Sequence, residues 1–493
     1  MNKILKIHKD DIVAVALEEI VGDSLVSYLD QEVRTLEDIP AGHKVALRDI
    51  RAGEEIIKYG HPIGIATHDI KAGDWVHIHN VRTALSDLLD YTYTPSIPVM
   101  EKKEPVMFSG YRRKDGKVGI RNAVWIIPTV GCVNHITRML ASKGKESLPK
   151  NVDDVIAFPH PYGCSQMSED KENTRQVLAD FALHPNAGAV LIVGLGCENI
   201  NISVLEEALG DYDKERIFFL NCQDVEDEME VGFSLLQKAL SYANQWKREP
   251  IPASELIIGL KCGGSDGFSG ITANPVVGQF SDLLIGQGGT TILTEVPEMF
   301  GAETILMNRC INKEVFDKTV TLINDFKTYF TSNHQPIYEN PAPGNKVGGI
   351  TTLEDKSLGC TQKAGSAPVS GVLNYAEPVK SKGLHLLCAP GNDLVAATAL
   401  CASGAHIVLF TTGRGTPFSS PVPTVKIASN SVMAKRKANW IDFDAGKALD
   451  GVPLSELGED LFSIVIDIAS GKKAKSEEDG FADMAIFKTG VTV

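Results

Sequence analysis

The segment Ala189-Val190-Leu191-Ile192-Val193-Gly194-Leu195-Gly196-Cys197-Glu198-Asn199 joins an apolar run to a Gly-Cys pair, with a carboxamide two residues after the cysteine. The run has the length of a buried β-strand, and the glycine allows a sharp turn after it. This Gly-Cys motif recurs at Gly131-Cys132-Val133-Asn134, Gly163-Cys164-Ser165-Gln166 and Gly359-Cys360-Thr361-Gln362. The first three motifs lie about 32 residues apart, roughly one βαβ unit. Because parallel strands end at one edge of a sheet, we expect Cys132, Cys164 and Cys197 side by side at that edge.

Apolar runs and helical patterns alternate around these motifs. Strands are predicted at residues 124–128, 155–158, 189–193 and 217–220, and helices at residues 174–183 and 204–209. Strands and helices alternating at this interval indicate a parallel sheet covered by helices. We therefore predict an α/β parallel-sheet domain over residues 107–246, with Cys222 as a fourth thiol at a strand end.

The first 90 residues repeat one five-residue phrase that ends in glycine. It occurs as Asp38-Ile39-Pro40-Ala41-Gly42, Asp49-Ile50-Arg51-Ala52-Gly53 and Asp69-Ile70-Lys71-Ala72-Gly73, each before a short apolar stretch such as residues 75–79. Repeated turns with short strands predict a small β-rich domain over residues 1–90. Residues 88–107 are rich in Pro, Tyr, Lys and Glu and are predicted to be a linker.

The last half of the chain indicates a larger and less regular α/β domain over residues 253–493. Strands are predicted at residues 256–260, 291–293, 384–387 and 407–410, after a linker at residues 247–252. Long Gly- and Pro-rich loops separate them, and loops of this length in a compact domain usually carry function. The predicted fold class is therefore α/β multidomain, with a small β-rich N-terminal domain.

Composition excludes several classes of partner. The formal net charge of −15 argues against nucleic acid, which requires a concentrated basic surface. No stretch approaches 18 uninterrupted apolar residues, so we expect no membrane span. The nine cysteines are odd in number and dispersed, which indicates a reducing, cytoplasmic location rather than a disulfide scaffold. The net charge of −15 is compatible with a small anionic substrate. The oligomeric state is left open, with a homo-oligomer possible.

Two groups of residues are candidate metal ligands. Cys132, Cys164 and Cys197 would offer three converging soft ligands, which favour iron or zinc, although free cysteines are often simply small core residues. His77 and His79 stand two residues apart on a predicted strand, so their rings would emerge on one face as a start for a divalent site. An exposed histidine pair without a ligand is the alternative interpretation.

Polar residues after predicted strands are candidates for substrate binding and catalysis. Ser265 and Asp266 lie in a glycine-rich loop that could cradle an anion or be an ordinary tight loop. Arg414, flanked by glycines, suits bidentate capture of a carboxylate, and Asn80 and Arg82 add a polar tip beside the histidines. Glu298 and Lys356 are both candidates for the general base.

With these residues in view, the chain resembles the altronate/galactarate dehydratase family from end to end. The resemblance rests on nine motifs: Ile57-Lys58-Tyr59-Gly60, His77-Ile78-His79-Asn80, Pro128-Thr129-Val130-Gly131-Cys132-Val133-Asn134, Tyr162-Gly163-Cys164-Ser165-Gln166, Gly194-Leu195-Gly196-Cys197-Glu198-Asn199, Cys262-Gly263-Gly264-Ser265-Asp266-Gly267, Thr294-Glu295-Val296-Pro297-Glu298-Met299-Phe300-Gly301-Ala302-Glu303, Thr352-Leu353-Glu354-Asp355-Lys356-Ser357-Leu358-Gly359-Cys360 and Thr412-Gly413-Arg414-Gly415-Thr416-Pro417. It implies that the N-terminal repeats form a SAF-type β domain.

The resemblance also implies an activity and a metal. It implies a hydro-lyase that converts D-altronate to 2-dehydro-3-deoxy-D-gluconate and water in hexuronate breakdown, with ferrous iron as cofactor and manganese also associated with the family. Galactarate dehydration and a non-catalytic sugar-acid-binding protein are the alternatives. We assign the iron to His77 and His79 or to the three thiols, which could instead hold an iron–sulfur cluster. Arg414 would capture the carboxylate, and the base is open between Glu298 and Lys356.

Overall fold

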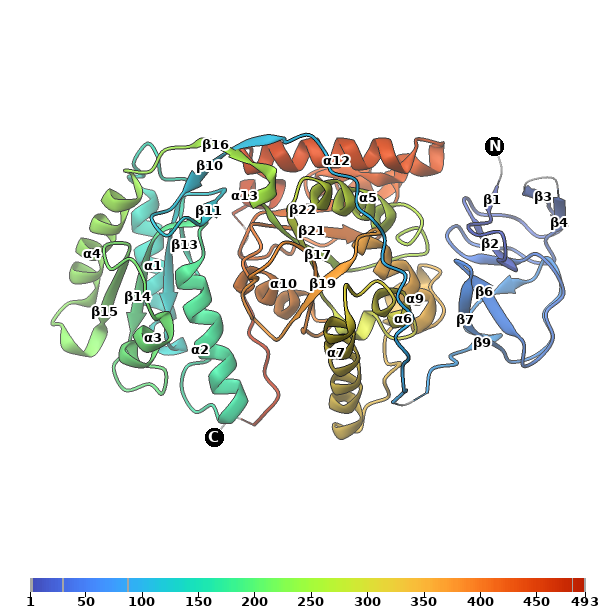
Figure 1. The fold of residues 1–493 in the computed structure, drawn as a ribbon, viewed down its shortest axis with the longest axis horizontal. Coiled ribbons are helices and arrows are strands. Elements are labelled where there is room, and N and C mark those ends of the chain that lie inside the picture. The colour runs from blue at the N-terminus through green and yellow to red at the C-terminus, as the bar shows by residue number, and fades with distance from the viewer. Residues whose placement is uncertain (1–2, 29–30, 87, 481, 492–493) are drawn as a thin grey trace.

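The structure is a computed structural model that describes residues 3–28, 31–86, 88–480 and 482–491. Three units lie in a row, with the N-terminal β unit at one end, an α/β unit at the other and the largest α/β unit between them (Figure 1). This architecture confirms the predicted α/β multidomain class. None of the helices in the described ranges combines the length and apolar character that a membrane span requires.

In the described residues of the N-terminal unit, short antiparallel strands form three small sheets. These are β1 (Ile4–Leu5), β2 (Val13–Ala16), β5 (Lys44–Ala46) and β8 (Trp75–Val76); β3 (Leu25–Tyr28) with β4 (Gln31–Arg34); and β6 (Glu55–Lys58), β7 (His61–Ala66) and β9 (Val81–Arg82). The glycines that end the repeated phrase, Gly42, Gly53 and Gly73, have φ of +82°, +84° and +93°. Such φ values favour glycine, so each phrase forms a turn as predicted.

The predicted strand at residues 75–79 is wrong beyond Val76. His77 to His79 lie in a turn, because the Asn80 side chain competes with the strand ladder for the backbone. Its Oδ1 accepts a hydrogen bond from the His77 N–H at 2.8 Å, and its Nδ2 donates to the Trp75 carbonyl at 2.8 Å. His77 is consequently buried and His79 exposed, so the two rings do not share a face.

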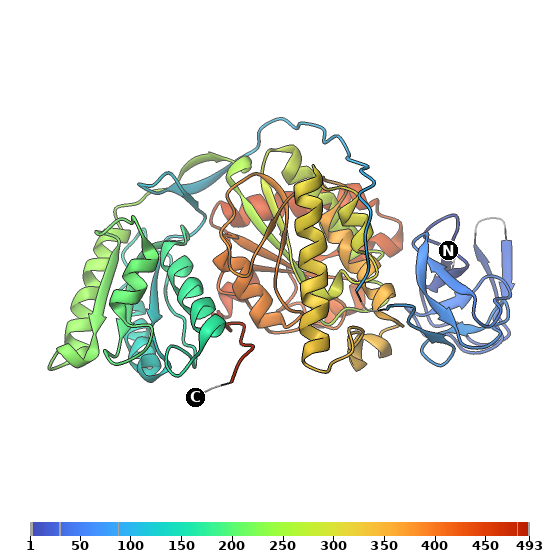
Figure 2. The same ribbon diagram turned by 60° about the horizontal axis from the view of Figure 1, so that its bottom comes forward.

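The segment from residue 88 to residue 106 has no regular secondary structure and runs along the third unit to reach the second (Figure 2). Tyr91 and Tyr93 fix it there, because their hydroxyls donate to Glu303 at 2.5 Å and to the Cys310 carbonyl at 2.7 Å. The predicted linker is therefore a strap packed on the third unit rather than a free tether.

The second unit contains the predicted parallel sheet, in the order β13-β12-β14-β15. Its strands are β12 (Ala123–Pro128), β13 (Val155–Ala157), β14 (Ala187–Gly194) and β15 (Ile217–Asn221). Apolar residues of α1 (Asn134–Lys145) and α4 (Glu228–Ala243) cover one face, and those of α2 (Ser168–Leu183) and α3 (Ile202–Leu209) cover the other. Short 3₁₀ turns follow β12 at Gly131–Val133 and β15 at Cys222–Asp224.

A small antiparallel sheet joins the second and third units. It contains β10 (Met107–Arg112), β11 (Val118–Gly119) and β16 (Glu249–Pro252). The prediction of a linker at residues 247–252 is therefore wrong from Glu249 onward, since β16 pairs with β10 and buries Ile251. A continuous apolar cluster that includes Trp125 of the second unit and Leu400 of the third also joins the two units.

The third unit is built on a seven-stranded parallel sheet in the order β19-β20-β18-β17-β21-β22-β23. The strands are β17 (Ile257–Cys262), β18 (Thr290–Leu293), β19 (Val369–Leu373), β20 (Gly383–Leu387), β21 (Ile407–Thr412), β22 (Thr424–Ala428) and β23 (Phe443–Asp444). The helices are α5 (Ala273–Gly286), α6 (Glu303–Met307), α7 (Lys313–Ser332), α8 (Pro343–Val347), α9 (Leu353–Cys360), α10 (Asp393–Ala402), α11 (Ser431–Arg436), α12 (Leu454–Ala469) and α13 (Lys475–Glu478). Further 3₁₀ turns are Ala253–Glu255, Val296–Glu298, Thr361–Ala364 and Ala445–Asp450.

Candidate functional site

The third unit's sheet reverses its strand order at β17. The chain first places β18, β19 and β20 on one side of β17, and then β21, β22 and β23 on the other. Open parallel sheets bind ligands outside the carboxyl ends of the strands at such a reversal. β17 ends there in Cys262, and the segment after β18 brings Glu298 to the same edge.

Three buried side chains meet at this edge. The Sγ atoms of Cys262 and Cys360 lie 3.0 Å and 3.1 Å from Oε2 of Glu298, and 3.5 Å from each other. Cys360 is supplied by α9, which is buried along its whole length. Within the described ranges this is the group of Cys, His, Asp and Glu whose ligand atoms are close enough together to hold a metal ion.

Buried lysines surround the two thiols and the carboxylate. Lys356 Nζ lies 2.6 Å from Oε1 of Glu298, the oxygen that faces away from the thiols, and donates to Asn340 Oδ1 at 2.9 Å. Burial alone would raise the pKa of Glu298, but Lys356 and Lys363 hold it well below its ordinary value. Burial disfavours the charged form of Lys363 too and would lower its pKa, but Cys262 and the neighbouring acidic groups raise this pKa. Glu298 is therefore ionised, and the lysines are protonated.

The two thiols share one proton. A hydrogen bond from Cys360 lowers the pKa of Cys262 to about 6, whereas the same contact and burial raise the pKa of Cys360 well above its ordinary value. A metal ion takes up thiolates, so its binding would release the remaining proton. Bonds of about 2.3 Å at a tetrahedral ion would place two thiolates roughly 3.8 Å apart, close to the distance observed here. The donor set therefore fits a single divalent ion.

The N-terminal unit contacts α9 through a buried charge cluster. Nζ of Lys44 and Nζ of Lys58 each lie 2.9 Å from a carboxylate oxygen of Asp355, and all three side chains are at most 3% exposed. Burial and the nearby charge of Lys58 together lower the pKa of Lys44 to about 8, because one carboxylate cannot neutralise two ammonium groups. Burial opposes the charge on Lys58 as well, but Asp355 raises the pKa of Lys58. Asp355 precedes Lys356, so this contact lies beside the metal-ligand group.

The glycine-rich loop after β17 lies against this group. Ser265 and Lys356 line a small cavity with Cys360, and the buried Ser265 hydroxyl has no hydrogen-bond partner among the described residues. Asp266 instead holds the loop together, because its Oδ1 accepts hydrogen bonds from the hydroxyls of Ser269 and Ser429 and its Oδ2 accepts one from Asn430 Nδ2. The predicted residues Ser265, Glu298 and Lys356 are thus brought together, while both oxygens of Asp266 are occupied by the protein.

Arg414 lies at the mouth of the same edge. Its side chain is exposed and donates to the Gly344 carbonyl at 3.0 Å, and its backbone N–H donates to the Gly264 carbonyl at 3.1 Å. The guanidinium therefore stands between the glycine-rich loop and the segment that contains α8.

The predicted residues of the N-terminal unit do not converge on one ion. The His77 ring stacks on Trp75 at 5.3 Å, and burial lowers its pKa to about 3, so the ring is neutral. His79 packs on Trp75 at a tilt and stays exposed. Asn80 uses its side chain to close the turn, and the Arg82 guanidinium is exposed on β9.

Cys132, Cys164 and Cys197 follow β12, β13 and β14, which are neighbours in the second sheet. All three thiols are exposed and none is in a disulfide. The structure thus places them at neighbouring strand ends. Their sulfurs do not form a group within the 4.8 Å spread of ligand atoms that Cys262, Glu298 and Cys360 satisfy.

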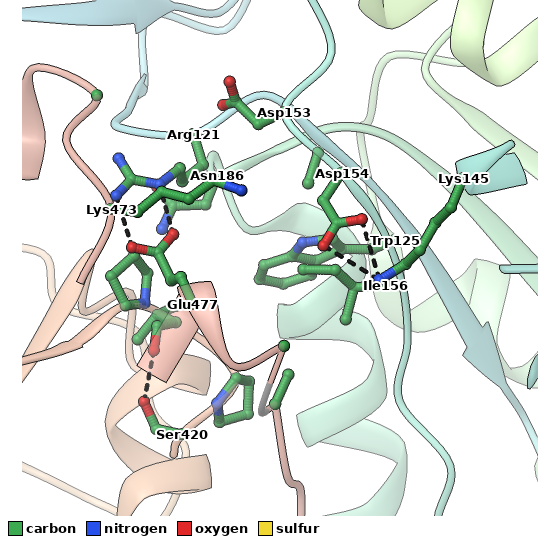
Figure 3. Close-up of a pocket in the computed structure, with 17 residues that line it drawn as sticks. Arg121, Trp125, Lys145, Asp153, Asp154, Ile156, Asn186, Ser420, Lys473 and Glu477 are labelled. Carbon is green, nitrogen blue, oxygen red and sulfur yellow. Dashed lines mark hydrogen bonds and ion pairs between the residues drawn. The ribbon is translucent and has the colours of Figure 1, made fainter. Parts of the chain in front are cut away.

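A cavity of about 90 Å³ lies between the second and third units (Figure 3). Four of the charged residues that line it are paired with one another: Arg121 with Glu477 at 2.7 Å, and Lys145 with Asp154 at 3.1 Å. Its described lining contains neither cysteine nor histidine. We interpret it as a seam between units rather than as a reaction site.

Sequence reasoning missed the pairing of Cys262 with Cys360. The signal was present, since Cys360 belongs to the fourth Gly-Cys motif and Cys262 follows a predicted strand. The two residues are 98 positions apart, however, and no local pattern joins them. Lys44, Lys58 and Lys363 were missed for the same reason, because their partners come from distant segments or other units.

Family models match nearly the whole chain. The Altronate/galactarate dehydratase SAF domain matches residues 2–84, the D-galactarate dehydratase/Altronate hydrolase second domain residues 110–244, and the D-galactarate/Altronate dehydratase C-terminal model residues 253–492. The chain is 54% identical to altronate dehydratase of Bacillus subtilis (strain 168), over 100% of both chains. It is 52% identical to altronate dehydratase of Escherichia coli (strain K12), over 99% of each. It is 34% identical to galactarate dehydratase (L-threo-forming) of Escherichia coli (strain K12), over 95% of this chain and 93% of that one.

Proposed function

The chain belongs to the D-galactarate/altronate dehydratase family, and we propose that it is a hydro-lyase that converts D-altronate to 2-dehydro-3-deoxy-D-gluconate and water. One observation carries the choice of substrate. Identity to the two altronate dehydratases is above 50% along the whole chain, against 34% to the galactarate enzyme. The nine free thiols favour a reducing compartment, so we assign the enzyme to the cytoplasm.

Dehydration removes the proton at C2 and expels the C3 hydroxyl, and the enol so formed becomes the 2-keto acid. The C2 carbanion needs its neighbouring carboxylate neutralised. We assign this task to Lys356, which lines the same small cavity as Ser265, whose hydroxyl has no hydrogen-bond partner among the described residues. Arg414 at the mouth would draw the anionic substrate in.

Glu298 is the proposed base, acting through Oε1. In the structure Lys356 pairs with this oxygen at 2.6 Å and keeps its pKa low, which makes it a weak base. A substrate carboxylate that pairs with Lys356 would weaken this interaction and raise the pKa of Glu298 towards the working pH. The protonated Lys356 serves as the acid partner rather than as the base, since Glu298 raises its pKa although burial would lower it.

Cys262, Cys360 and Oε2 of Glu298 would hold the divalent ion, which we propose to be ferrous iron. Two thiolates favour iron or zinc, whereas manganese prefers oxygen donors. When bound, such an ion would stabilise negative charge on the substrate oxygens as a Lewis acid. The two oxygens of Glu298 would then have separate tasks, one towards the thiols and one towards Lys356.

The segment from Asn340 to Gly349 covers this site. Asn345 donates to the Ser265 carbonyl at 2.8 Å, and the Val347 carbonyl contacts the His43 ring of the N-terminal unit. The cavity beneath holds only about 10 Å³, the space of one water molecule. We infer that a sugar acid enters when this segment moves away from the glycine-rich loop.

The choice of substrate can be tested directly. The anaerobic enzyme supplied with ferrous iron should form 2-keto acid from D-altronate far faster than from galactarate, measured as kcat/KM for each. Equal or reversed values would move the assignment to the galactarate branch. The absence of 2-keto acid from both, despite tight binding of altronate, would support a non-catalytic binding protein.

The alternative metal site in the N-terminal unit is tested by His77→Ala and His79→Ala. Both variants should keep the wild-type metal content, because one ring is buried and the other exposed and no third ligand joins them among the described residues. Cys262→Ser, as the comparator, should lose the single ion assigned to Cys262, Glu298 and Cys360. A loss of metal from either histidine variant as large as that from Cys262→Ser would return the site to the histidines.

A further inference from the structure

Two of the three carboxamides in the Gly-Cys motifs of the second unit link the cysteine loops to one another. Asn134, after β12, donates from Nδ2 to the His160 carbonyl at 2.9 Å and accepts from the His160 N–H at 3.3 Å, in the loop after β13. Asn199, after β14, accepts at Oδ1 from the Ser165 N–H at 2.8 Å. Gln166 accepts from the Gly163 N–H at 3.1 Å and closes its own loop. The recurring sequence motif therefore describes one assembly of three loops.

The backbone draws these loops over the end of the central strand. β12 lies between β13 and β14, yet the Ile200 N–H after β14 donates to the Gly163 carbonyl after β13 at 3.3 Å. A Cβ on Gly163 would stand 2.0 Å from the Thr129 carbonyl oxygen, so only glycine allows this approach to β12. The Gly131 N–H also donates to the Tyr162 carbonyl at 2.9 Å. Cys132, Cys164 and Cys197 are thus held on one small patch.

The surroundings of the sulfurs suit thiolate ligands. Gln223 Nε2 lies 3.7 Å from Sγ of Cys197, and the Ser165 hydroxyl lies 3.9 Å from Sγ of Cys164, both within reach of a weak hydrogen bond to sulfur. Hydrogen bonds to sulfur tune the potential of iron–sulfur centres. The buried Glu198 fixes the turn before Cys197, because it accepts from the N–H groups of Leu195 and Gly196 at 3.1 Å and 2.6 Å.

The spacing of the three sulfurs distinguishes between kinds of metal centre. A single ion requires its ligand atoms in close contact, as at Cys262, Glu298 and Cys360, and these three thiols are more widely spread. An iron–sulfur cluster binds each thiolate to a different iron and so accepts a wider spread. Three exposed thiols held on one patch by a repeated motif fit the cluster.

We propose that Cys132, Cys164 and Cys197 ligate an iron–sulfur cluster at the carboxyl edge of the second unit's sheet, with one iron left without a protein thiolate. This centre is separate from the Cys262–Glu298–Cys360 site and does not rest on the substrate assigned above. The cluster would place a redox-active, air-sensitive group on the second unit.

The test uses the full-length chain, reconstituted anaerobically with ferrous iron and sulfide. We expect about four acid-labile sulfides per chain and a broad visible absorption, as for a cubane cluster. Cys132→Ser, Cys164→Ser and Cys197→Ser should each lose most of the sulfide and of the absorption while the far-UV circular dichroism stays unchanged. Cys222→Ser, at the end of the next strand, and the buried Cys401→Ala are matched controls that should keep both.

Three outcomes would overturn the proposal. They are wild-type protein without labile sulfide after reconstitution, a triple serine variant that keeps the visible absorption, and one zinc per chain on these thiols with no sulfide. Cys262→Ser separates the two centres, because it should lose the single ion yet keep the full sulfide content. Loss of sulfide from that variant would contradict a separate cluster.

Discussion

Replacing Glu298 with glutamine should lower kcat/KM by about 10³-fold and release the single metal ion assigned to Cys262, Glu298 and Cys360. The amide removes the charge that both thiols and Lys356 contact, at 3.0 Å, 3.1 Å and 2.6 Å. It also removes the proposed base, so the loss should fall on kcat rather than on KM alone. Metal content by elemental analysis and steady-state kinetics with D-altronate measure the two effects.

A matched control separates catalysis from stability. Glu303→Gln also neutralises a buried glutamate facing a buried lysine, since Glu303 lies 3.4 Å from Lys327 Nζ with both side chains at most 4% exposed. Both variants should lose stability, because each leaves a buried ammonium group without its partner. Only Glu298→Gln should lose its metal. Equal metal loss in the two variants would mean that Glu298 acts through the fold and not as a ligand.

Local patterns were sufficient to predict the second unit. The run at residues 124–128 became β12, Ala123–Pro128, and the run at residues 189–193 became β14, Ala187–Gly194, because buried parallel strands are continuous apolar runs. In the third unit β22 was not predicted, since Lys426 interrupts its apolar sequence. That lysine is nonetheless buried, with its pKa lowered to about 8 by burial.

The candidate site was predictable only in part. Glu298, Lys356 and Ser265 stood out as polar residues after strands or inside recurring motifs, and they do meet. Their partners depend on tertiary contacts: Cys262 lies 98 residues from Cys360, and Lys44 lies 311 residues from Asp355. For the histidines, the sequence predicted a contact that the structure does not contain. Their spacing of two residues predicted that both rings lie on one face of a strand, but the Asn80 side chain ends the strand before His77.

Replacing Asp355 with asparagine should detach the N-terminal unit and abolish most of the activity. The carboxylate is the shared partner of Lys44 and Lys58, and breaking a buried pair of this kind costs about 3–5 kcal/mol. Lys58 and Tyr59 line the small cavity with Lys356, so detachment would open the site to water. Limited proteolysis of the 88–106 segment, urea unfolding and kcat/KM measure the effect. Asp49→Asn, which removes an exposed ion pair with Lys71 in the same unit, should leave all three unchanged.

The pH dependence of this contact follows from the shifted pKa of Asp355. Lys44 and Lys58 hold the pKa of Asp355 below its ordinary value although burial would raise it, so the folded state favours the carboxylate. The stabilisation is therefore complete above the unfolded pKa of about 4 and is lost as the pH falls below it. The difference in stability between wild type and Asp355→Asn should accordingly be constant from about pH 5 to pH 7 and shrink in stronger acid. A difference that grows as the pH falls would show that the docking does not depend on the Asp355 charge.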